Sequence, residues 1–361
     1  MSAYAIYRLP HEDYATFVQQ TEGEPAEFLS YSELNDRHGF VVAPFEVTPR
    51  QPILLIRPDR VERVTLSSRS EESGVGREKC LRAECNLTPH STLLTPRQDY
   101  AIDFANYHAQ LKAGIFRKIV LARCAEEASE VPIDPMELFH RACELYPRMF
   151  ISLVSTSKSG VWLIATPEIL LEGKMHDWHT VALAGTMKLE GDSLMGEGEK
   201  VTWATKDIQE QRIVTTYIAE CLEQFTGDFR EEGPRTVRAA NLVHLRSDFA
   251  FTLPDGHRLG DLLHALHPTP AVCGLPKRET FNFIIQNEHT PRRYYSGFMG
   301  MLDPEGGTHL YVSLRCMNIE GSHYHLYAGG GLLAESTVTQ EWLETEAKLE
   351  TMRQCLAIKK M

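Results

Sequence analysis

Acidic residues one helical turn apart occur in two stretches whose composition favours helix. Asp207 and Glu210 form the first pair, and Glu341 and Glu344 form the second. A spacing of three residues puts both side chains of a pair on one helix face. Carboxylate oxygens are ligands that Mg²⁺ prefers, so the two pairs are candidate magnesium ligands. A solvated acidic helix surface is the alternative for either pair taken singly.

Three consecutive glycines, Gly329, Gly330 and Gly331, precede the second acidic pair. A backbone without side chains can approach a ligand closely and direct its N–H groups toward an anion. We therefore expect an anion-binding loop here, directly after a strand. Lys348 lies seven residues after Glu341 and shares its helix face. This combination favours a site in which a metal holds an anionic substrate against the loop.

Two further residues have types and surroundings suited to proton transfer. Lys118 lies in a β-branched run and would share a strand face with Val120 and Ala122. Loss of hydration on an apolar face lets a lysine act as a base, whereas an edge-strand lysine would extend to water. Glu168 follows Pro167 between apolar segments. A desolvated glutamate keeps its proton and can act as an acid, whereas a turn glutamate would be solvated.

Arg315 and Tyr295 are candidates for binding a carboxylate. A strand over 309–317 would place Tyr311, Ser313 and Arg315 on one face. Arginine binds a carboxylate through two parallel hydrogen bonds, and a tyrosine hydroxyl adds another donor. A structural ion pair and a tyrosine at the core edge are the alternatives for these two residues.

The elements that must position these residues are grouped rather than alternating. Helices are expected at 99–113, 135–145, 199–225, 262–266 and 339–355. Strands are expected at 116–124, 150–154, 160–165, 170–174, 181–184, 236–252, 292–302, 309–317 and 323–328. Grouped strands with helices between the groups predict an α+β fold with a large antiparallel sheet system and helices outside. A polar, exposed loop is expected at 67–80, and no break in composition divides the chain, so we predict a single domain over 1–361.

The overall composition excludes several classes of protein. The chain has 361 residues and a formal net charge of −12, which disfavours nucleic-acid binding and anionic membrane surfaces. The sequence shows neither a signal peptide nor an apolar run long enough to cross a bilayer. The eight cysteines are scattered, and only Cys80 and Cys85 lie close together. Reduced thiols in the cytoplasm are therefore expected.

Ten short motifs, in their order along the chain, resemble those of the chorismate-utilising enzymes and, among them, the isochorismate synthases. The motifs lie at 117–123, 166–168, 182–186, 206–210, 241–245, 266–274, 295–300, 314–315, 327–331 and 341–348. They define a catalytic core over about 100–353, with 1–95 as a divergent N-terminal part of the same fold. Cys273 departs from the pattern, since a glycine is usual there.

The resemblance implies a central cleft that binds chorismate with Mg²⁺ as cofactor. Glu210 and Glu344 match the principal metal-binding acids, and Asp207 and Glu341 match their partners one turn away. The metal would hold the ring carboxylate of the substrate. The resemblance also implies substrate contacts from Gly185, Thr186, His244, Tyr295, Arg315, Gly329, Gly330, Gly331 and Lys348. Ala271 is similar to the residue of isochorismate synthases, whereas relatives that eliminate pyruvate are more often threonine-like there.

The expected activity is the isomerisation of chorismate to isochorismate. By resemblance, Lys118 activates a water for attack at C2, and Glu168 protonates the C4 hydroxyl as it leaves. The expected enzyme is a cytoplasmic monomer without an obligate protein partner, serving menaquinone or siderophore biosynthesis. Alternatives are a salicylate synthase or an ammonia-using anthranilate or aminodeoxychorismate synthase component. A non-catalytic subunit that binds a partner enzyme is the alternative from another class.

Overall fold

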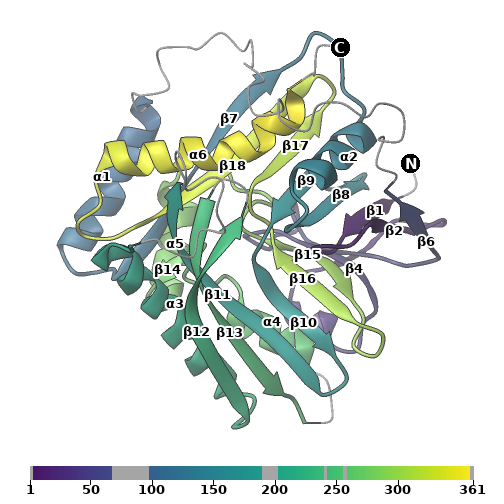
Figure 1. Ribbon diagram of the computed structural model, residues 1–361, viewed down its shortest axis with the longest axis horizontal. Helices are drawn as coiled ribbons and strands as arrows, with labels where there is room; N and C mark the ends of the chain where they lie inside the picture. The colour runs from purple at the N-terminus through teal and green to yellow at the C-terminus, as the bar shows by residue number, and fades with distance from the viewer. Residues whose placement is uncertain (1–2, 67–96, 189–201, 240–241, 255–257, 358–361) are drawn as a thin grey trace, which may run out of the picture.

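The computed structural model describes residues 3–66, 97–188, 202–239, 242–254 and 258–357. Two antiparallel sheets, each of nine strands, dominate this part of the chain, and helices lie outside them (Figure 1). The predicted α+β class is therefore confirmed. The loop expected at 67–80 and the Cys80–Cys85 pair lie outside the described residues. None of the helices in the described ranges has the length and apolar character needed to cross a membrane.

The first sheet contains the strand that carries Lys118. Its strands, in spatial order, are β14 (Gly274–Leu275), β7 (Lys118–Ala128), β18 (His323–Leu332), β17 (Cys316–Glu320), β9 (Gly160–Thr166), β8 (Phe150–Thr156), β1 (Tyr4–Arg8), β2 (Tyr14–Gln19) and β6 (Arg60–Thr65). The pairing of β1 with β8 joins the N-terminal part of the chain to the part after residue 100.

The second sheet contains the strands around His244. In spatial order they are β12 (Phe229–Ala239), β13 (Leu242–Thr252), β11 (Asp177–Lys188), β10 (Ile169–Lys174), β16 (Thr308–Val312), β15 (Phe298–Leu302), β4 (Gly39–Ala43), β5 (Ile53–Ile56) and β3 (Ala26–Phe28). Here too an N-terminal strand, β4, pairs with a late one, β15.

Both faces of the second sheet are buried, which explains the unbroken apolar runs near the N-terminus. In β4, Phe40 and Val42 pack between the two sheets, while Val41 and Ala43 pack toward the helices. Alternation along a strand sends successive side chains to opposite faces, so a strand covered on both sides needs apolar residues throughout. Between the sheets, the ring of Phe150 from the first sheet stacks on the ring of Tyr311 from the second, with the ring centroids 4.3 Å apart.

Helices cover the outer faces of both sheets. They are α1 (Gln98–Lys112), α2 (Pro135–Leu145), α3 (Thr205–Leu222), α4 (Leu259–Leu266), α5 (Lys277–Asn287) and α6 (Val338–Leu356), with a 3₁₀ turn η1 (Tyr31–Leu34). Figure 1 shows α6 across β7 and β18 of the first sheet, whereas α3 lies against β11 and β13 of the second. The side chain of Asp134 caps α2 by accepting a hydrogen bond from the Met136 amide.

Three predicted strands differ from the structure, and one helix was missed. The expected strand at 236–252 is divided between β12 and β13, which pair with each other. The expected strand at 309–317 is wrong, because β16 ends at Val312 in the second sheet and β17 begins at Cys316 in the first. The expected strand at 292–302 begins only at Phe298. Helix α5 lies in a stretch to which the sequence analysis assigned no element.

The chain crosses from one sheet to the other at two places, and a candidate site residue lies at each crossing. Glu168 lies between β9 and β10, and Arg315 lies between β16 and β17. The Val312 amide donates to the Glu168 carbonyl at 2.9 Å, and the Ala165 amide donates to the Arg315 carbonyl at 3.2 Å. These bonds hold the two crossings side by side.

Candidate active site

A cleft lies at the two crossings. Fifteen residues line it: Val120, Pro167, Glu168, Leu183, Glu210, His244, Ala271, Val272, Tyr295, Leu314, Arg315, Ala328, Gly329, Gly331 and Lys348. Nine of the sixteen residues singled out from the sequence are among them. The other seven, Lys118, Asp207, Gly185, Thr186, Gly330, Glu341 and Glu344, lie behind or beside this lining.

Glu168 is a buried carboxyl group in the wall of the cleft, with 3% of its surface exposed. Burial raises its pKa to about 8, although the charges of Lys118, Lys348 and Arg315 oppose that shift. Desolvation penalises the charged form of an acid, so this carboxyl group carries a proton at neutral pH. Glu168 can therefore donate a proton to a group bound in the cleft.

Lys118 lies at the start of β7 and has no exposed surface. Its ammonium is 2.8 Å from Glu210 Oε1, and Glu210 in turn lines the cleft. Burial alone would raise the pKa of Glu210, but Lys118 more than offsets this and lowers it. The lysine is thus held directly behind a charged carboxylate at the edge of the cleft.

The remaining acids of α3 and α6 also face lysines or each other. Lys206 Nζ is 2.5 Å from Glu341 Oε1, which also accepts a hydrogen bond from Ser336. Lys348 Nζ donates to Glu344 Oε1 at 2.7 Å and to the Gly329 carbonyl at 2.9 Å. Burial, reinforced by Glu344, raises the pKa of Glu341 to about 6.

Asp207 lies one turn before Glu210 on α3, and Gly185 lies against it. A Cβ at Gly185 would come within 3.1 Å of Asp207 Cβ. Burial, reinforced by Glu210, raises the pKa of Asp207 to about 6. The carboxylates of α3 and α6 thus sit close enough to oppose each other's ionisation.

The three glycines lie inside β18, so the expected loop after the strand is wrong. Gly329, Gly330 and Gly331 pair with Ala122, Leu121 and Val120 of β7. The Gly329 carbonyl bonds Lys348 rather than β7. In an antiparallel strand the N–H and C=O of one residue point the same way, and successive residues alternate. Gly329 and Gly331 therefore direct their amides away from β7, and both line the cleft.

Close packing of functional groups explains why these positions are glycine. A Cβ at Gly329 would lie 2.7 Å from Tyr295 Oη, and one at Gly331 would lie 2.3 Å from Glu210 Oε1. At Gly330 it would meet Glu341 Oε2 at 3.0 Å. Each glycine thus leaves room for one side chain of the site.

His244 and Arg315 form the opposite end of the cleft. His244 Nδ1 is 3.0 Å from the Gly185 carbonyl, and Nε2 is 2.5 Å from Arg315 Nη2. These partners put the ring proton on Nδ1 and leave Nε2 to accept from the guanidinium. Burial and the Arg315 charge lower the pKa of His244 well below its ordinary value. Burial lowers the pKa of Arg315 to about 10.

Local backbone geometry explains how these residues reach the cleft. The pairing of β11 with β13 shifts register between Ala184 and Met187, and Gly185 adopts a φ of +68° at this bulge. The bulge turns the Gly185 carbonyl toward His244, with Thr186 Oγ1 3.3 Å from the same ring nitrogen. Arg315 itself has a φ of +45°, a conformation that costs energy for a residue with a side chain.

Tyr295 approaches from the turn before β15. Its side chain is buried, and its ring stacks on Tyr327 at 5.7 Å. Burial raises the pKa of its hydroxyl, which therefore stays protonated and can donate a hydrogen bond. Tyr295 and Arg315 are thus both donors at the cleft.

The acids fit a divalent cation by their chemistry. Oxygen donors on two helices are suited to Mg²⁺, and Glu341 Oε2 is a buried carboxylate oxygen without a hydrogen-bond partner. Within the described ranges no three His, Cys, Asp or Glu side chains are gathered closely enough to hold an ion as they stand. In this structure, lysine side chains balance the negative charge of the acids.

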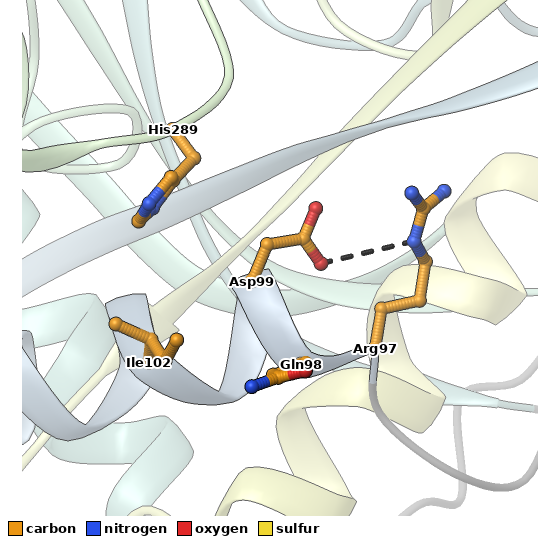
Figure 2. Close-up of a pocket in the computed structure, with 5 residues that line it drawn as sticks. All are labelled: Arg97, Gln98, Asp99, Ile102 and His289. Carbon is orange, nitrogen blue, oxygen red and sulfur yellow. Dashed lines mark ion pairs between the residues drawn. The ribbon is translucent and has the colours of Figure 1, made fainter.

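A second hollow lies at the N-terminal end of α1. Figure 2 shows its lining residues, Arg97, Gln98, Asp99, Ile102 and His289, with Arg97 Nε 3.7 Å from Asp99 Oδ1. None of these residues lines the cleft. The ring of His289 is ion-paired with Asp103. Arg97 is paired with Asp99, and His289 with Asp103, so we assign no chemistry to this hollow.

Sequence reasoning missed the apolar lining and one lysine. Val120, Leu183 and Leu314 line the cleft, and strand alternation from Lys118 could have identified Val120. Lys206 was part of a recognised motif, but no role was assigned to it. Its contact with Glu341 joins α3 to α6, which are separated by more than a hundred residues. Local spacing carries no signal for such a contact.

The sequence is similar to those of known proteins. The chorismate binding enzyme family matches residues 59–357. Isochorismate synthase EntC of Escherichia coli is 28% identical over 313 residues, which cover 86% of this chain and 78% of that protein. The salicylate biosynthesis isochorismate synthase of Pseudomonas aeruginosa is 30% identical over 269 residues, covering 72% of this chain and 55% of that protein.

Solved structures show the same fold. The menaquinone-specific isochorismate synthase MenF of Escherichia coli superposes with a TM-score of 0.77 at 23% identity, covering 99% of this chain and 89% of that one. Anthranilate synthase component I of Streptococcus pneumoniae has a TM-score of 0.67 at 16% identity, covering 98% and 90%.

Proposed function

The chain belongs to the chorismate binding enzyme family, and from this premise we propose that it is an isochorismate synthase, an isomerase that converts chorismate to isochorismate. Relatives over most of its length carry that name. The observation that carries the proposal is the buried, protonated Glu168 in a cleft that also holds a lysine and an arginine. Binding alone would not require an acid in the cleft and a candidate base directly behind its lining.

We assign Lys118 as the base and Glu168 as the acid. Lys118 takes a proton from a water that attacks C2 of chorismate. The ring double bonds shift, and the C4 hydroxyl leaves as water with the proton from Glu168. One water enters and one leaves, so the product is an isomer. Lys118 can accept this proton only as a neutral amine, whereas here its ammonium is paired with Glu210 at 2.8 Å. The proposal therefore requires the ammonium to pass its proton to Glu210, and the pair to separate, before the water attacks.

Orientation of the substrate is as important as proton transfer. We propose that Arg315 and Tyr295 bind the enolpyruvyl carboxylate together with the free amides of Gly329 and Gly331. The assignment is supported by the donors that these residues direct into the cleft. Gly185 and Thr186 are assigned to the ring carboxylate, His244 to the ring, and Lys348 to the region between substrate and metal. Gly330 acts by making room for Glu341.

Glu210 and Glu344, with Asp207 and Glu341, would hold a Mg²⁺ ion. When bound, the ion supplies positive charge for the ring carboxylate of the substrate. The unpartnered Glu341 Oε2 and the opposed ionisation of Glu341 and Asp207 support this assignment. A cation relieves repulsion among these carboxylates, whereas a solvated acidic surface would need no such relief.

We further propose that Ala271 keeps the reaction at isochorismate. It is a small apolar side chain in the lining of the cleft and adds no hydroxyl near the bound product. Every role in the proposed reaction is assigned to a residue of this chain, and we propose that the enzyme acts in the cytoplasm as a monomer.

The test is incubation of the purified protein with chorismate and Mg²⁺, without ammonia, followed by chromatographic identification of products. We expect a stable mixture of chorismate and isochorismate. Salicylate with pyruvate would overturn the role of Ala271 and indicate a salicylate synthase. A product only when ammonia is supplied would indicate an aminating enzyme. No product under any condition would favour a subunit without turnover.

A further inference from the structure

A buried ion pair lies beside the cleft, in a segment that the site assignment does not use. Glu288 follows α5, and Arg292 comes four residues later; their side chains are 3% and 2% exposed. Arg292 Nε donates to Glu288 Oε2 at 2.6 Å, and Nη2 donates to Oε1 at 2.7 Å. The guanidinium also lies over the ring of Phe45. Nothing in the reaction proposed above requires these groups.

The pair completes the edge of the strand that carries Lys118. Strand β14 pairs with β7 only at Lys118 and Ile119. Beyond that point, Arg292 Nη2 donates to the Val120 carbonyl at 2.7 Å, and the Ala122 amide donates to Glu288 Oε1 at 2.8 Å. Side chains thus replace the missing neighbour strand and satisfy backbone groups that burial would otherwise leave unpaired.

Arg292 also reaches two other walls of the cleft, one through its guanidinium and one through its backbone carbonyl. Arg292 Nη1 donates to the Val272 carbonyl at 2.7 Å, next to Ala271. The Arg292 carbonyl accepts a hydrogen bond from the Tyr295 amide at 2.9 Å. One residue therefore joins the strand of Lys118, the turn of Ala271 and the turn of Tyr295. Val120, Val272 and Tyr295 all line the cleft.

Stability alone does not explain such a pair. Apolar residues of similar volume often serve as well as a buried ion pair, because desolvation offsets the attraction between the charges. A rigid, planar guanidinium with several fixed donors does provide geometry that apolar packing cannot. Small displacements of catalytic groups are costly in rate.

We infer that Glu288 and Arg292 are positioning residues that fix the spacing between Lys118, Ala271 and Tyr295. They touch backbone atoms of the three walls and not the substrate. The kinetic part of the test rests on the proposed function; the structural part does not.

Arg292→Lys keeps the charge but offers three N–H donors where the guanidinium makes the four hydrogen bonds described above. We expect kcat with chorismate to fall by about tenfold or more, while KM changes less than about threefold, as for loss of transition-state geometry. The control is Phe139→Leu, which weakens a fully buried contact on α2. It lowers thermal stability while leaving kcat near that of the wild type. Equal kcat in Arg292→Lys and Phe139→Leu would overturn the inference.

Glu288→Gln is the second variant, and its readout needs no substrate. It keeps an oxygen for the Ala122 amide but removes the charge that orients Arg292. We expect faster amide hydrogen exchange in the segment 118–122 with exchange in α2 unchanged. Protection of 118–122 equal to that of the wild type in the folded variant would overturn the inference. A wild-type protein without turnover would instead count against the proposed function, and the exchange measurement would still decide on the pair.

Discussion

The two ends of the cleft balance charge in opposite ways. At the end formed by α3 and α6, three of the four carboxylates are ion-paired with Lys118, Lys206 and Lys348. At the other end, the Arg315 guanidinium faces a neutral His244 ring at 2.5 Å. Arginine bound to a neutral partner keeps its full charge for a ligand, whereas lysines bound to carboxylates do not.

This difference indicates how a dianion would be oriented. A carboxylate can bind directly at Arg315, because positive charge there is uncompensated by an ion pair. At the acidic end a carboxylate would meet negative charge, so it needs a cation between itself and the acids. The proposed direction of chorismate, with its enolpyruvyl carboxylate at Arg315 and its ring carboxylate at the metal, follows from this asymmetry.

We expect the largest effect on turnover from replacing Lys118, at the acidic end of the cleft. Lys118→Ala removes the proposed base, and we expect kcat to fall by about 10²–10⁴-fold, the range of general-base catalysis. Isochorismate formation is measured by chromatography, and circular dichroism checks the fold, since Glu210 loses its partner. Lys112→Ala, an exposed position at the end of α1, is the control. Wild-type turnover by a folded Lys118→Ala protein would eliminate the base assignment.

Glu168 lies between the two ends, and its replacement comes next. Glu168→Gln keeps the shape but cannot give up a proton as an acid, so we expect a fall in kcat of about 10²-fold. In the wild type, we expect activity to fall as pH rises through about 8, where Glu168 ionises. The pH profile of the variant lacks that limb. An unchanged limb in Glu168→Gln would assign it to another group.

The same carboxyl group links pH to folding stability. Its pKa is raised from 4.5 to about 8 in the folded chain, so the folded state holds an extra proton between these values. The stability contributed by Glu168 is full below pH 4.5 and is lost as pH rises to about 8. Urea titrations across this window are expected to show a smaller decline for Glu168→Gln than for the wild type.

The sequence predicted the residue types at both ends better than the backbone that presents them. Helix α2 was predicted with the bounds that the structure shows, because the signals that begin and end a helix are local. Arg315 lines the cleft, yet the strand that was expected to carry it does not exist as predicted. The chain leaves the second sheet at Val312, and Arg315 adopts a positive φ that no local pattern requires.

The features that the sequence did not predict depend on contacts between segments far apart in the chain. The glycines were expected in a loop because a bare backbone can approach an anion. They lie in a strand instead, paired with β7 and packed against Glu210 of α3 and Glu341 of α6. The ion pair of Glu288 and Arg292 looks like an ordinary helix-end pair in the sequence. Its bonds to β7 and to Val272 depend on how the sheet edge is closed.

Arg315→Lys changes the other end of the cleft, and we expect a smaller effect than from Lys118→Ala. The variant keeps the positive charge but loses the planar pair of donors that binds a carboxylate. We expect KM for chorismate to rise about 10–100-fold, equivalent to a charge-assisted hydrogen bond of about 1.5–3 kcal/mol. Steady-state kinetics measure the change at saturating Mg²⁺. A larger effect on the Mg²⁺ requirement than on KM would reverse the proposed orientation of the substrate.

Glu344→Ala tests whether the acidic end holds the cation, and its effect is the smallest. Three carboxylates remain, and Lys348 loses its bond to Glu344 at 2.7 Å, so the freed ammonium repels a cation nearby. We expect the affinity for Mg²⁺ to fall by about tenfold, a change comparable to loss of a supporting ligand. Calorimetric titration of the substrate-free protein measures it, with Glu220→Ala, exposed on α3, as control. At saturating Mg²⁺ we expect KM to change little in Glu344→Ala and greatly in Arg315→Lys, so the two variants distinguish the two ends of the cleft. Equal Mg²⁺ affinity in Glu344→Ala and Glu220→Ala would remove Glu344 from the metal site.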